Sequence, residues 1–185
     1  TQTVAIRTKR ISSYPMLGKQ KKFKDELRNL GFNMNYMPTV DVNNNPLNPV
    51  INSRSYSDEP IMVAKKGKIA AKAMSDALML PTPKHFPGHG NTNVDSHLGL
   101  PIVDCTKKEL YEIELKPFQE LIKDNVDGIM VAHILYKNID SVYPSSISHE
   151  VITKLLKEEM NQLEIIKYFC LNCSSLTFHT QKLQQ

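Results

Sequence analysis

A short stretch with three histidines is the part of this sequence best equipped to carry out chemistry. It reads KHFPGHG over residues 84–90, and DSH follows over residues 95–97; residues 84–97 are called the histidine loop below. The density of glycine and proline predicts a fixed loop rather than a helix or a strand. A loop that follows a strand and carries several titratable groups is typical of an enzyme active site.

Asp95 and His97 form a candidate acid/base pair within this loop. They are two residues apart, so both side chains can point to the same side of the chain. A carboxylate beside an imidazole favours the charged ring, fixes its tautomer and raises its pKa towards neutral pH. The histidine is then a usable general acid. The alternative is a surface ion pair worth about 0–1 kcal/mol, and the glycine-rich loop before the pair favours the catalytic interpretation.

Four further residues are candidates for contacts with a ligand. Lys84 and His85 come where a predicted strand ends, so we expect both to donate hydrogen bonds to hydroxyl or acyl oxygens. Asp41 ends an earlier strand and could accept bonds from two sugar hydroxyls, with a helix or loop cap as an equally supported alternative. Arg54 follows a loop rich in Asn and Pro. Its planar fork suits bidentate contacts, although a solvated surface arginine fits the sequence too.

A metal site is the alternative chemistry for the histidines. Four histidines and one aspartate could in principle form a zinc or iron site: His85, His89, Asp95, His97 and His133. However, proline and glycine lie between the first two histidines, so their rings cannot share a helical face as in a HExxH motif. The sequence also contains no glycine-rich phosphate-binding motif. We therefore expect no metal ion and no organic cofactor.

Three strands with polar residues at their ends are expected, over residues 32–40, 80–86 and 128–133. Asp41, the histidine loop and His133 come at the ends of these strands. Because the carboxyl ends of parallel strands lie on one face of the fold, where active sites occur, these groups predict an enzyme site there.

Helices are expected between these strands. The ranges are residues 19–30, 57–78 and 148–160, with a further helix after a Thr106-x-x-Glu109 capping box. Pro117 predicts a kink in that further helix. Alternating strands and helices predict an α/β fold with parallel strands and the helices outside them.

The composition fits one soluble globular domain and excludes several other classes. The chain has 185 residues, 41% of them hydrophobic and 23% charged, with a net charge of +4. The densest basic run, residues 19–28, has apolar residues at helical spacing, so we interpret it as a solvated helix face and expect no nucleic-acid partner. No apolar run predicts a membrane span and no signal peptide is visible. The sequence does not decide between a cytoplasmic and a secreted location, nor the oligomeric state.

The pattern KHFPGHG-x4-DSH resembles the signature of the β-N-acetylglucosaminidase branch of glycoside hydrolase family 3. The resemblance extends from about residue 31 to residue 160 and includes NMNYMPTVDVNNNPLNPVI, NSRSYSDEP, HLGLPIVD and GIMVAHILY followed by PSSIS. It implies a TIM-type (β/α)8 barrel. Only part of that barrel is expected here, because a closed barrel usually needs about 250 residues.

The resemblance also implies an activity and a set of roles. Family members are O-glycosyl hydrolases of carbohydrate or cell-wall sugar metabolism, which remove terminal β-linked N-acetylglucosamine by a retaining, two-step mechanism. By this resemblance His97 would be the acid/base and Asp95 its partner. The side chains that would hold an N-acetylglucosamine-containing saccharide are Arg54, Lys84 and His85, with Asp41 and His133 beside them.

The resemblance ends abruptly after Met160. Family members continue into a strand of the type FDGVVISDDL, whose aspartate is the nucleophile, whereas this chain reads NQLEIIKYFCLNCSSLTFHTQKLQQ. Its only acidic residue there is Glu164, so no nucleophile is identified. We expect residues 1–162 to form an incomplete barrel domain and residues 163–185 a tail unrelated to the family, as a frameshift, an early stop or a misjudged gene boundary would produce. The chain then belongs to a β-N-acetylhexosaminidase or is a non-catalytic, sugar-binding remnant of one, and we expect it to be inactive by itself.

Overall fold

The computed structural model describes residues 5–6, 25–95 and 98–160. Three parts of the chain for which predictions were made are outside these residues: the first part of the helix over residues 19–30, His97 of the candidate acid/base pair, and the tail from residue 161 on. Residues 25–29 are helical, and Gly31 follows with a φ of 90°. This left-handed conformation is typical of a glycine that ends a helix, so the described part of the predicted helix is confirmed.

The described strands are short, and all of their pairings are parallel. Their bounds are β1 Ala5–Ile6, β2 Met34–Asn35, β3 Leu80–Pro81, β4 Lys84–Phe86, β5 Ile102–Val103, β6 Met130–Val131 and β7 Leu135–Tyr136. They pair in the orders β1-β2-β3, β4-β6 and β5-β7. Parallel strands require crossover connections, which helices supply here, so the α/β class is confirmed.

The first two predicted strands are each interrupted near a proline. Pro38 separates β2 from an isolated bridge between Thr39 and Lys84, and residues 82–83 separate β3 from β4. Proline has no N–H to donate to a neighbouring strand, which explains the interruptions. Beyond Pro38 the Val40 N–H donates to the Lys84 carbonyl oxygen at 2.8 Å. The end of the first segment therefore runs beside the start of the histidine loop.

The helices follow the predicted order. Their bounds are η1 Asn52–Arg54, α2 Pro60–Ser75, α3 Lys107–Glu109, η2 Leu110–Glu114, α4 Lys116–Lys123 and η3 Glu150–Glu159. The capping box is confirmed, because the Thr106 hydroxyl accepts from the Glu109 N–H at 3.1 Å and the Glu109 carboxylate accepts from the Thr106 N–H at 2.8 Å. The predicted start of the last helix is confirmed too, since the Ser148 hydroxyl accepts from the Val151 N–H at 3.1 Å. None of the described helices is long and apolar enough to cross a membrane.

The helical segment before Pro117 contains a wide turn. The Leu115 N–H donates to the carbonyl oxygen of Leu110, five residues back, at 2.9 Å, and α4 begins immediately afterwards with Pro117 in its first turn. A proline has no N–H and clashes with the carbonyl four residues before it, and a wider turn relieves both problems. This wide turn directly precedes the position where a kink was predicted, and the kink itself stays a prediction.

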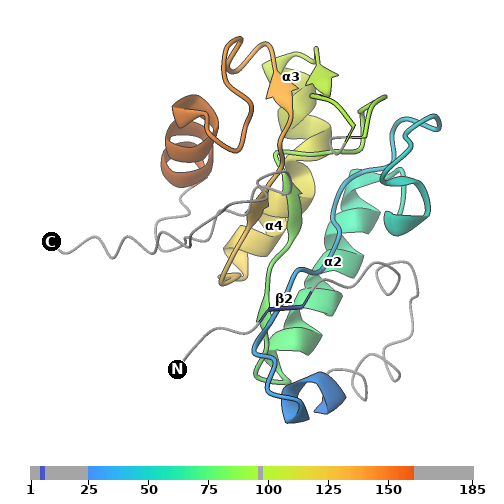
Figure 1. Cartoon of the computed structure of the whole chain (residues 1–185), viewed down its shortest axis with the longest axis vertical. Helices are drawn as coiled ribbons and strands as arrows, with labels where there is room; N and C mark the ends of the chain where they lie inside the picture. The colour runs from blue at the N-terminus through green and yellow to red at the C-terminus, as the bar shows by residue number, and fades with distance from the viewer. Residues whose placement is uncertain (1–4, 7–24, 96–97, 161–185) are drawn as a thin grey trace, which may run out of the picture.

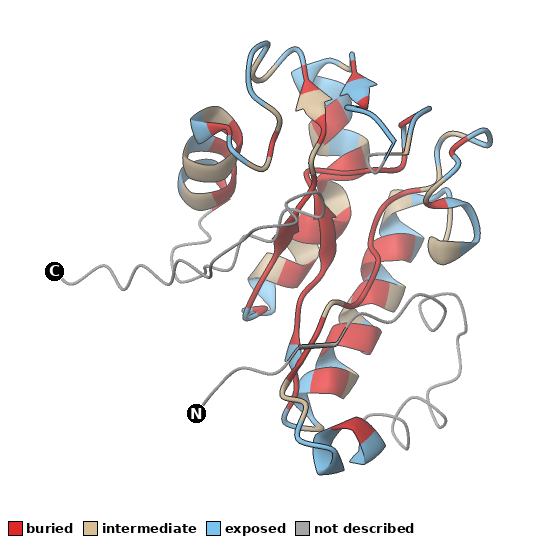
Figure 2. Ribbon diagram, in the orientation of Figure 1, coloured by how far each residue is buried: buried red, intermediate tan, exposed pale blue. Residues whose placement is uncertain are grey.

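Helices α2 and α4 pack side by side against the strands (Figure 1). Figure 2 shows that the buried residues run along the strands and along the helix faces that meet them. A Cβ on Gly67 of α2 would lie 2.7 Å from Val40 Cγ1, so this helix rests directly on the segment that leads to Asp41. The rings of Phe86 and Phe118 meet edge to face with centroids 5.3 Å apart, which ties α4 to β4.

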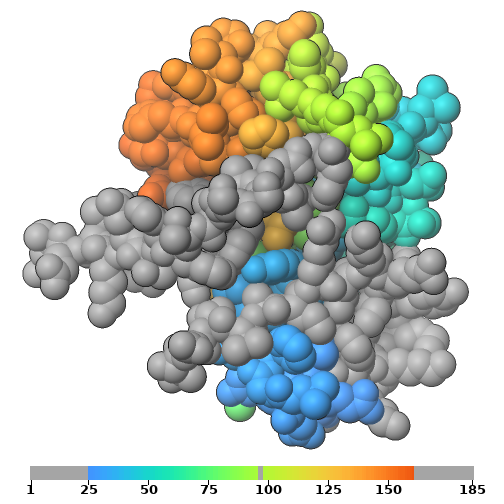
Figure 3. Space-filling view, viewed as in Figure 1, coloured from blue at the N-terminus to red at the C-terminus, as the bar shows by residue number. Residues whose placement is uncertain are grey.

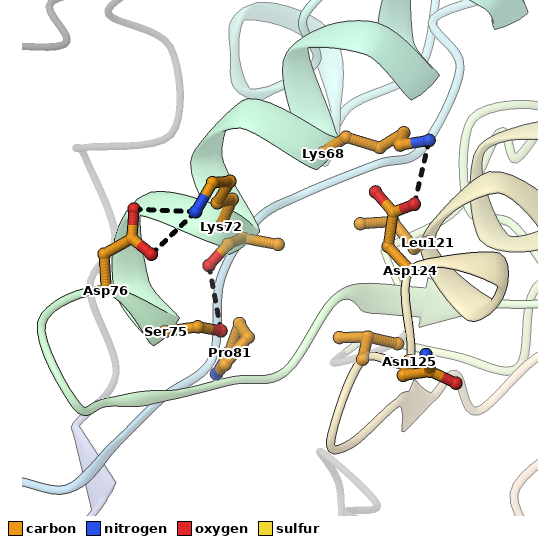
Figure 4. A pocket seen from close by; sticks show the side chains of 10 residues that line it. Lys68, Lys72, Ser75, Asp76, Pro81, Leu121, Asp124 and Asn125 are labelled. Carbon is orange, nitrogen blue, oxygen red and sulfur yellow. Dashed lines mark hydrogen bonds and ion pairs between the residues drawn. The ribbon is translucent and has the colours of Figure 1, made fainter.

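A cavity of about 370 Å³ lies between the last turns of α2 and α4 (Figure 4). Its rim is charged, because Lys68 Nζ lies 3.0 Å from Asp124 Oδ1. It opens beside Pro81 at the start of the strand segment 80–86, whereas the histidine loop continues from the end of that segment. The cavity is therefore at the opposite end of the strands from the candidate site.

Candidate active site

The segments that follow β2, β4 and β6 gather at one end of the molecule. In Figures 1 and 3 they are seen in cyan, light green and orange at the same end. The register supports this view, since Lys84 pairs with Met130 and Phe86 pairs with Val131 in parallel orientation. His133 therefore follows β6 on the side where residues 87–97 of the histidine loop follow β4. The expectation that three strand ends share a face is confirmed.

The carboxylate of Asp41 is buried and holds the start of the histidine loop. Its Oδ1 accepts from the backbone N–H groups of His85 at 3.1 Å and of His89 at 2.7 Å. Its Oδ2 lies 2.7 Å from His85 Nδ1. Asp41 is 0% exposed, so its carboxylate is engaged within the protein. This placement resembles the predicted cap more than the predicted contact with sugar hydroxyls.

At neutral pH, Asp41 is an ionised carboxylate and the His85 imidazole is neutral. Burial by itself raises the pKa of Asp41, but the charge and hydrogen bonds of His85 outweigh it and lower this pKa to about 2. Burial lowers the pKa of the His85 ring to about 4; the attraction of Asp41 opposes this, and the charges of Lys84 and Arg54 reinforce it. The pair therefore carries a single negative charge at pH 7.

Two polar side chains hold the rest of the loop through its backbone carbonyl groups. The Asn48 amide donates to the carbonyl oxygens of His89 and Gly90, both at 2.7 Å, and accepts from two backbone N–H groups of its own loop. The Tyr136 hydroxyl donates to the Gly88 carbonyl oxygen at 2.7 Å. Asn48 comes from the loop over residues 42–51, and Tyr136 is the last residue of β7. The loop is thus fixed from several directions, as a preorganised site requires.

His89 is a supporting residue that the sequence indicated only as an alternative metal ligand. It is 1% exposed, and its Nδ1 lies 2.6 Å from the Thr92 hydroxyl. Its ring packs edge to face on the His85 ring with centroids 5.6 Å apart. Burial lowers the pKa of His89, so this ring is uncharged at neutral pH. Its position next to His85 follows from the loop fold, which the spacing of the two histidines does not reveal.

Lys84 and Arg54 place positive charge around the two buried histidines. Lys84 is 4% exposed, and Arg54 is half-buried with Nη1 donating to the Val50 carbonyl oxygen at 3.2 Å. The charge of Arg54 depresses the pKa of both His85 and His89, which places the guanidinium near both rings. The structure therefore brings together Asp41, Arg54, Lys84 and His85, four of the candidates from the sequence.

His133 and Asp95 occupy the edges of this group. His133 is half-buried, and its Nδ1 lies 2.7 Å from the Ser146 hydroxyl. Burial lowers the pKa of this ring. Asp95 is half-buried, and its charge raises the pKa of His89, which places its carboxylate near the buried histidines. His97 lies outside the described residues, so the geometry of the predicted Asp95–His97 pair stays a prediction.

A buried glutamate lies directly beneath the loop. Glu114 is 3% exposed, and Asn44 Nδ2 donates to its Oε1 at 2.9 Å. Among the residues that the structure describes, none forms a hydrogen bond with its Oε2. A Cβ on Gly88 would lie 2.7 Å from the Glu114 Cβ, so the side chain fills the space under that glycine. Burial raises the pKa of Glu114 to about 8. Glu114 is therefore a neutral acid at pH 7, and only the glycine at position 88 allows it to lie there.

We expect Glu114 to make stability fall as the pH rises from about 6.5 to 8. Its folded pKa of about 8 exceeds the ordinary 4.5, so the folded state keeps a proton that the unfolded state releases. The stabilisation is complete below pH 4.5 and is lost as the pH approaches the folded pKa. The lowered pKa values of His85 and His89 make stability rise with pH instead, but only below the ordinary histidine pKa of 6.5.

Urea unfolding measured between pH 6.5 and 8 checks this expectation. The loss for the unsubstituted chain should be about 2 kcal/mol, from about 1.4 kcal/mol per pKa unit. Glu114→Gln keeps the shape without the titration and should flatten the profile over this range. As a control, Glu112→Gln on the solvent side of the same helical segment should leave the slope unchanged. A pH-independent unfolding free energy in the unsubstituted chain would contradict the buried neutral acid.

Within residues 25–95 and 98–160, no group of three or more His, Cys, Asp or Glu side chains is placed to hold a metal ion. One member of the alternative metal set, His97, is outside those ranges. What the described residues form is a rigid loop with a buried carboxylate–imidazole pair and two nearby cations. Such an arrangement can hold a polyhydroxylated ligand by directed hydrogen bonds, and Asp95 lies at its edge.

An α/β fold with polar loops at the ends of its parallel strands is an architecture that many enzymes share. Comparison with known proteins identifies the family within this class. The model of the glycosyl hydrolase family 3 N terminal domain matches residues 18–168. The chain therefore belongs to glycoside hydrolase family 3, as the sequence predicted. The boundary predicted between residues 162 and 163 is not tested by this match and stays a prediction.

Three relatives illustrate the similarity. The chain is 46% identical over 147 residues to a β-hexosaminidase A from Pseudoalteromonas piscicida, covering 73% of this chain. It matches the structure of a family 3 β-N-acetylglucosaminidase from Paenibacillus sp. str. FPU-7 with a TM-score of 0.81 and 41% identity over 84% of this chain. It matches NagZ from Neisseria gonorrhoeae in complex with N-trifluoroacetyl-D-glucosamine with a TM-score of 0.72 and 29% identity over 77% of this chain.

The chain spans a minority of the length of these relatives. It covers 25% of the Pseudoalteromonas protein, 30% of the Paenibacillus chain and 41% of the Neisseria chain. The family model, which matches residues 18–168, includes the strand ends and the loops described above.

Proposed function

We propose that this chain supplies the acid/base and sugar-holding part of a β-N-acetylhexosaminidase, which removes terminal β-linked N-acetylglucosamine with retention of configuration. The observation that carries the proposal is the histidine loop, fixed at the strand ends by Asp41, Asn48 and Tyr136 in a chain of this family. The names of the relatives support this substrate class. The strands and helices would then be a portion of a (β/α)8 barrel, with the site at its usual face.

The residues divide into three roles under this proposal. His97 donates a proton to the leaving-group oxygen and later removes one from water, with Asp95 raising its basicity. Lys84 and Arg54 hold sugar oxygens from the buried side of the site, where both place their positive charge. His133, with its Nδ1 near the Ser146 hydroxyl, lines the edge of the pocket. The attacking carboxylate is not assigned to any residue of this chain.

A second candidate function is a sugar-binding remnant without catalysis. It is favoured by the sequence after Met160, where Glu164 is the only acidic residue and no Ser-Asp-Asp run occurs. A retaining glycosidase needs a nucleophile to form the covalent glycosyl-enzyme. In this case residues 1–185 would bind N-acetylglucosamine and would not cleave its glycosides.

A chimera tests the first proposal. Residues 31–160 replace the matching stretch of the Pseudoalteromonas relative, which is 46% identical to this chain, and hydrolysis of a chromogenic N-acetyl-β-glucosaminide is measured. We expect about 1 turnover per second or more, as for ordinary enzymes, and much slower hydrolysis of the matching β-glucoside. A folded chimera that binds N-acetylglucosamine but cleaves neither compound would contradict the acid/base role of residues 31–160. The second candidate is tested with residues 1–185 themselves, which should bind N-acetylglucosamine without cleaving the glucosaminide.

A further inference from the structure

We propose that Asp41 is a positioning residue that holds the His85 ring in the Nδ1–H tautomer, so that Nε2 accepts a hydrogen bond from a hydroxyl of the substrate. The substrate half of this inference rests on the proposed function; the tautomer does not. From the sequence, His85 was predicted to donate to a ligand. The buried carboxylate beside its ring assigns the opposite direction.

The geometry leaves one arrangement of the proton between the two side chains. Asp41 Oδ2 lies 2.7 Å from His85 Nδ1, and both side chains are buried, with 0% and 3% of their surface exposed. Two backbone N–H groups already donate to the other carboxylate oxygen, Oδ1, and favour its charged form. An ionised carboxylate only accepts hydrogen bonds, so the proton of this contact is on Nδ1.

The second ring nitrogen is then an acceptor. A neutral imidazole has one N–H, so a proton on Nδ1 leaves a lone pair on Nε2. A doubly protonated ring would add a positive charge to a buried site that already contains Lys84 and Arg54, whose charges oppose it. The packing of His89 against this ring keeps its plane fixed. His85 therefore offers an acceptor in a place where the nearby cations offer only donors.

The acceptor Nε2 of His85 and the donor groups of Lys84 and Arg54 together select the kind of oxygen that can bind between them. A hydroxyl donates to His85 Nε2 and accepts from a lysine or an arginine at the same time. A carbonyl oxygen has no proton to donate, so it would face the lone pair of Nε2 without a hydrogen bond. His85 thus selects a sugar hydroxyl and disfavours the acyl oxygen of the N-acetyl group at its position.

Nitrogen NMR of the imidazole rings tests the tautomer in the 185-residue chain. Long-range ¹H–¹⁵N spectra should show His85 with a protonated Nδ1 and an unprotonated Nε2 at pH 7. In Asp41→Asn the amide can turn its NH₂ towards the ring, so Nδ1 becomes the acceptor and the proton should move to Nε2. Asp127→Asn, at an exposed aspartate, is the matched control and should leave the ring signals unchanged.

The kinetic consequence is measured in the chimera. Asp41→Asn should raise the KM for the N-acetylglucosaminide by roughly 10- to 100-fold, the loss expected when a buried hydrogen bond to substrate is replaced by two opposed donors. The kcat should fall less, because His85 takes no part in proton transfer to the leaving group. Asp127→Asn should leave both constants unchanged.

The outcomes separate this inference from the proposed function. A His85 signal with Nε2 protonated, in a folded chain without substitution, overturns the inference even if the chimera is active. The predicted tautomer together with a chimera that neither binds nor cleaves the substrate overturns the substrate half along with the proposed function. If Asp41→Asn does not fold, the spectrum of the unsubstituted chain still decides the tautomer. Folded Asp41→Asn with the original tautomer and an unchanged KM also overturns the positioning role.

Discussion

Replacing His97 by alanine in the chimera is expected to lower kcat for an N-acetylglucosaminide with a poor leaving group by about 10²–10⁴-fold, the range for loss of one general acid. The reason is the position of His97 two residues after Asp95 on a loop whose first part is fixed by Asp41. The KM should change little, because the proton is transferred in the transition state and contributes little to binding of the ground state.

The dependence on the leaving group makes this result specific. An activated aryl leaving group needs less protonation, so its release should suffer less from the same substitution. His149→Ala, at an exposed histidine, is the matched control and should keep the rates of the unsubstituted chimera. Near-unchanged rates with both kinds of leaving group would remove His97 from the acid/base role.

Replacing Gly90 by alanine is expected to destabilise the protein by about 3 kcal/mol, the upper end of the usual range for overpacking. A Cβ at this position would overlap the backbone carbonyl group of Val42. A backbone atom cannot move aside as a flexible side chain can, so either the histidine loop or the strand end before Asn43 must shift. Asn48, which donates to the Gly90 carbonyl oxygen at 2.7 Å, would lose its geometry as well.

Urea unfolding of the 185-residue chain measures this loss. Gly99→Ala is the matched control, because the one contact that a Cβ there would make with the described part of the chain is Val94 Cγ1 at an ordinary 3.6 Å. We expect that substitution to stay within about 0.5 kcal/mol of the original chain. In the chimera, Gly90→Ala should also reduce activity, since the loop that carries the site is displaced. Equal stability of the two alanine variants would show that the loop and the strand end are not in contact.

The sequence was sufficient to predict the fold class and the face that carries the site. Strands and helices alternate clearly, and the polar groups at the ends of three strands identify a shared edge. The capping box at Thr106 and the start of a helix at Ser148 were also predictable, because both are made by residues close together in the sequence. Local signals of this kind are read directly from spacing.

The support of the loop could not be predicted, because its contacts join residues far apart in the sequence. Asp41 and His85 are 44 positions apart, and Tyr136 reaches Gly88 across 48 positions. Spacing places a carboxylate at a strand end, but it does not show whether the carboxylate faces a ligand or the neighbouring loop. In the structure the Asp41 carboxylate is buried and accepts from two backbone N–H groups of the neighbouring loop.

Glu114 was not identified as a buried residue from the sequence, although the sequence contains a signal of its burial. It lies between Leu110 and Phe118 at intervals of four residues, so the three side chains fall on one face of the predicted helix. A single acid on an apolar helical face is either paired or neutral when buried. The structure gives the second outcome, with the side chain under Gly88 and a pKa raised by burial to about 8.

The most direct test of the central claim, that the histidine loop supplies the acid/base of a retaining glycosidase, is azide rescue of His97→Ala in the chimera with an activated substrate. Azide needs no general base to attack the anomeric carbon of the covalent intermediate and displace the enzyme carboxylate. If His97 is the acid/base, added azide restores turnover and the product is the β-glycosyl azide, with net retention after two displacements. A variant that azide does not accelerate, or a product with the α configuration, would contradict it.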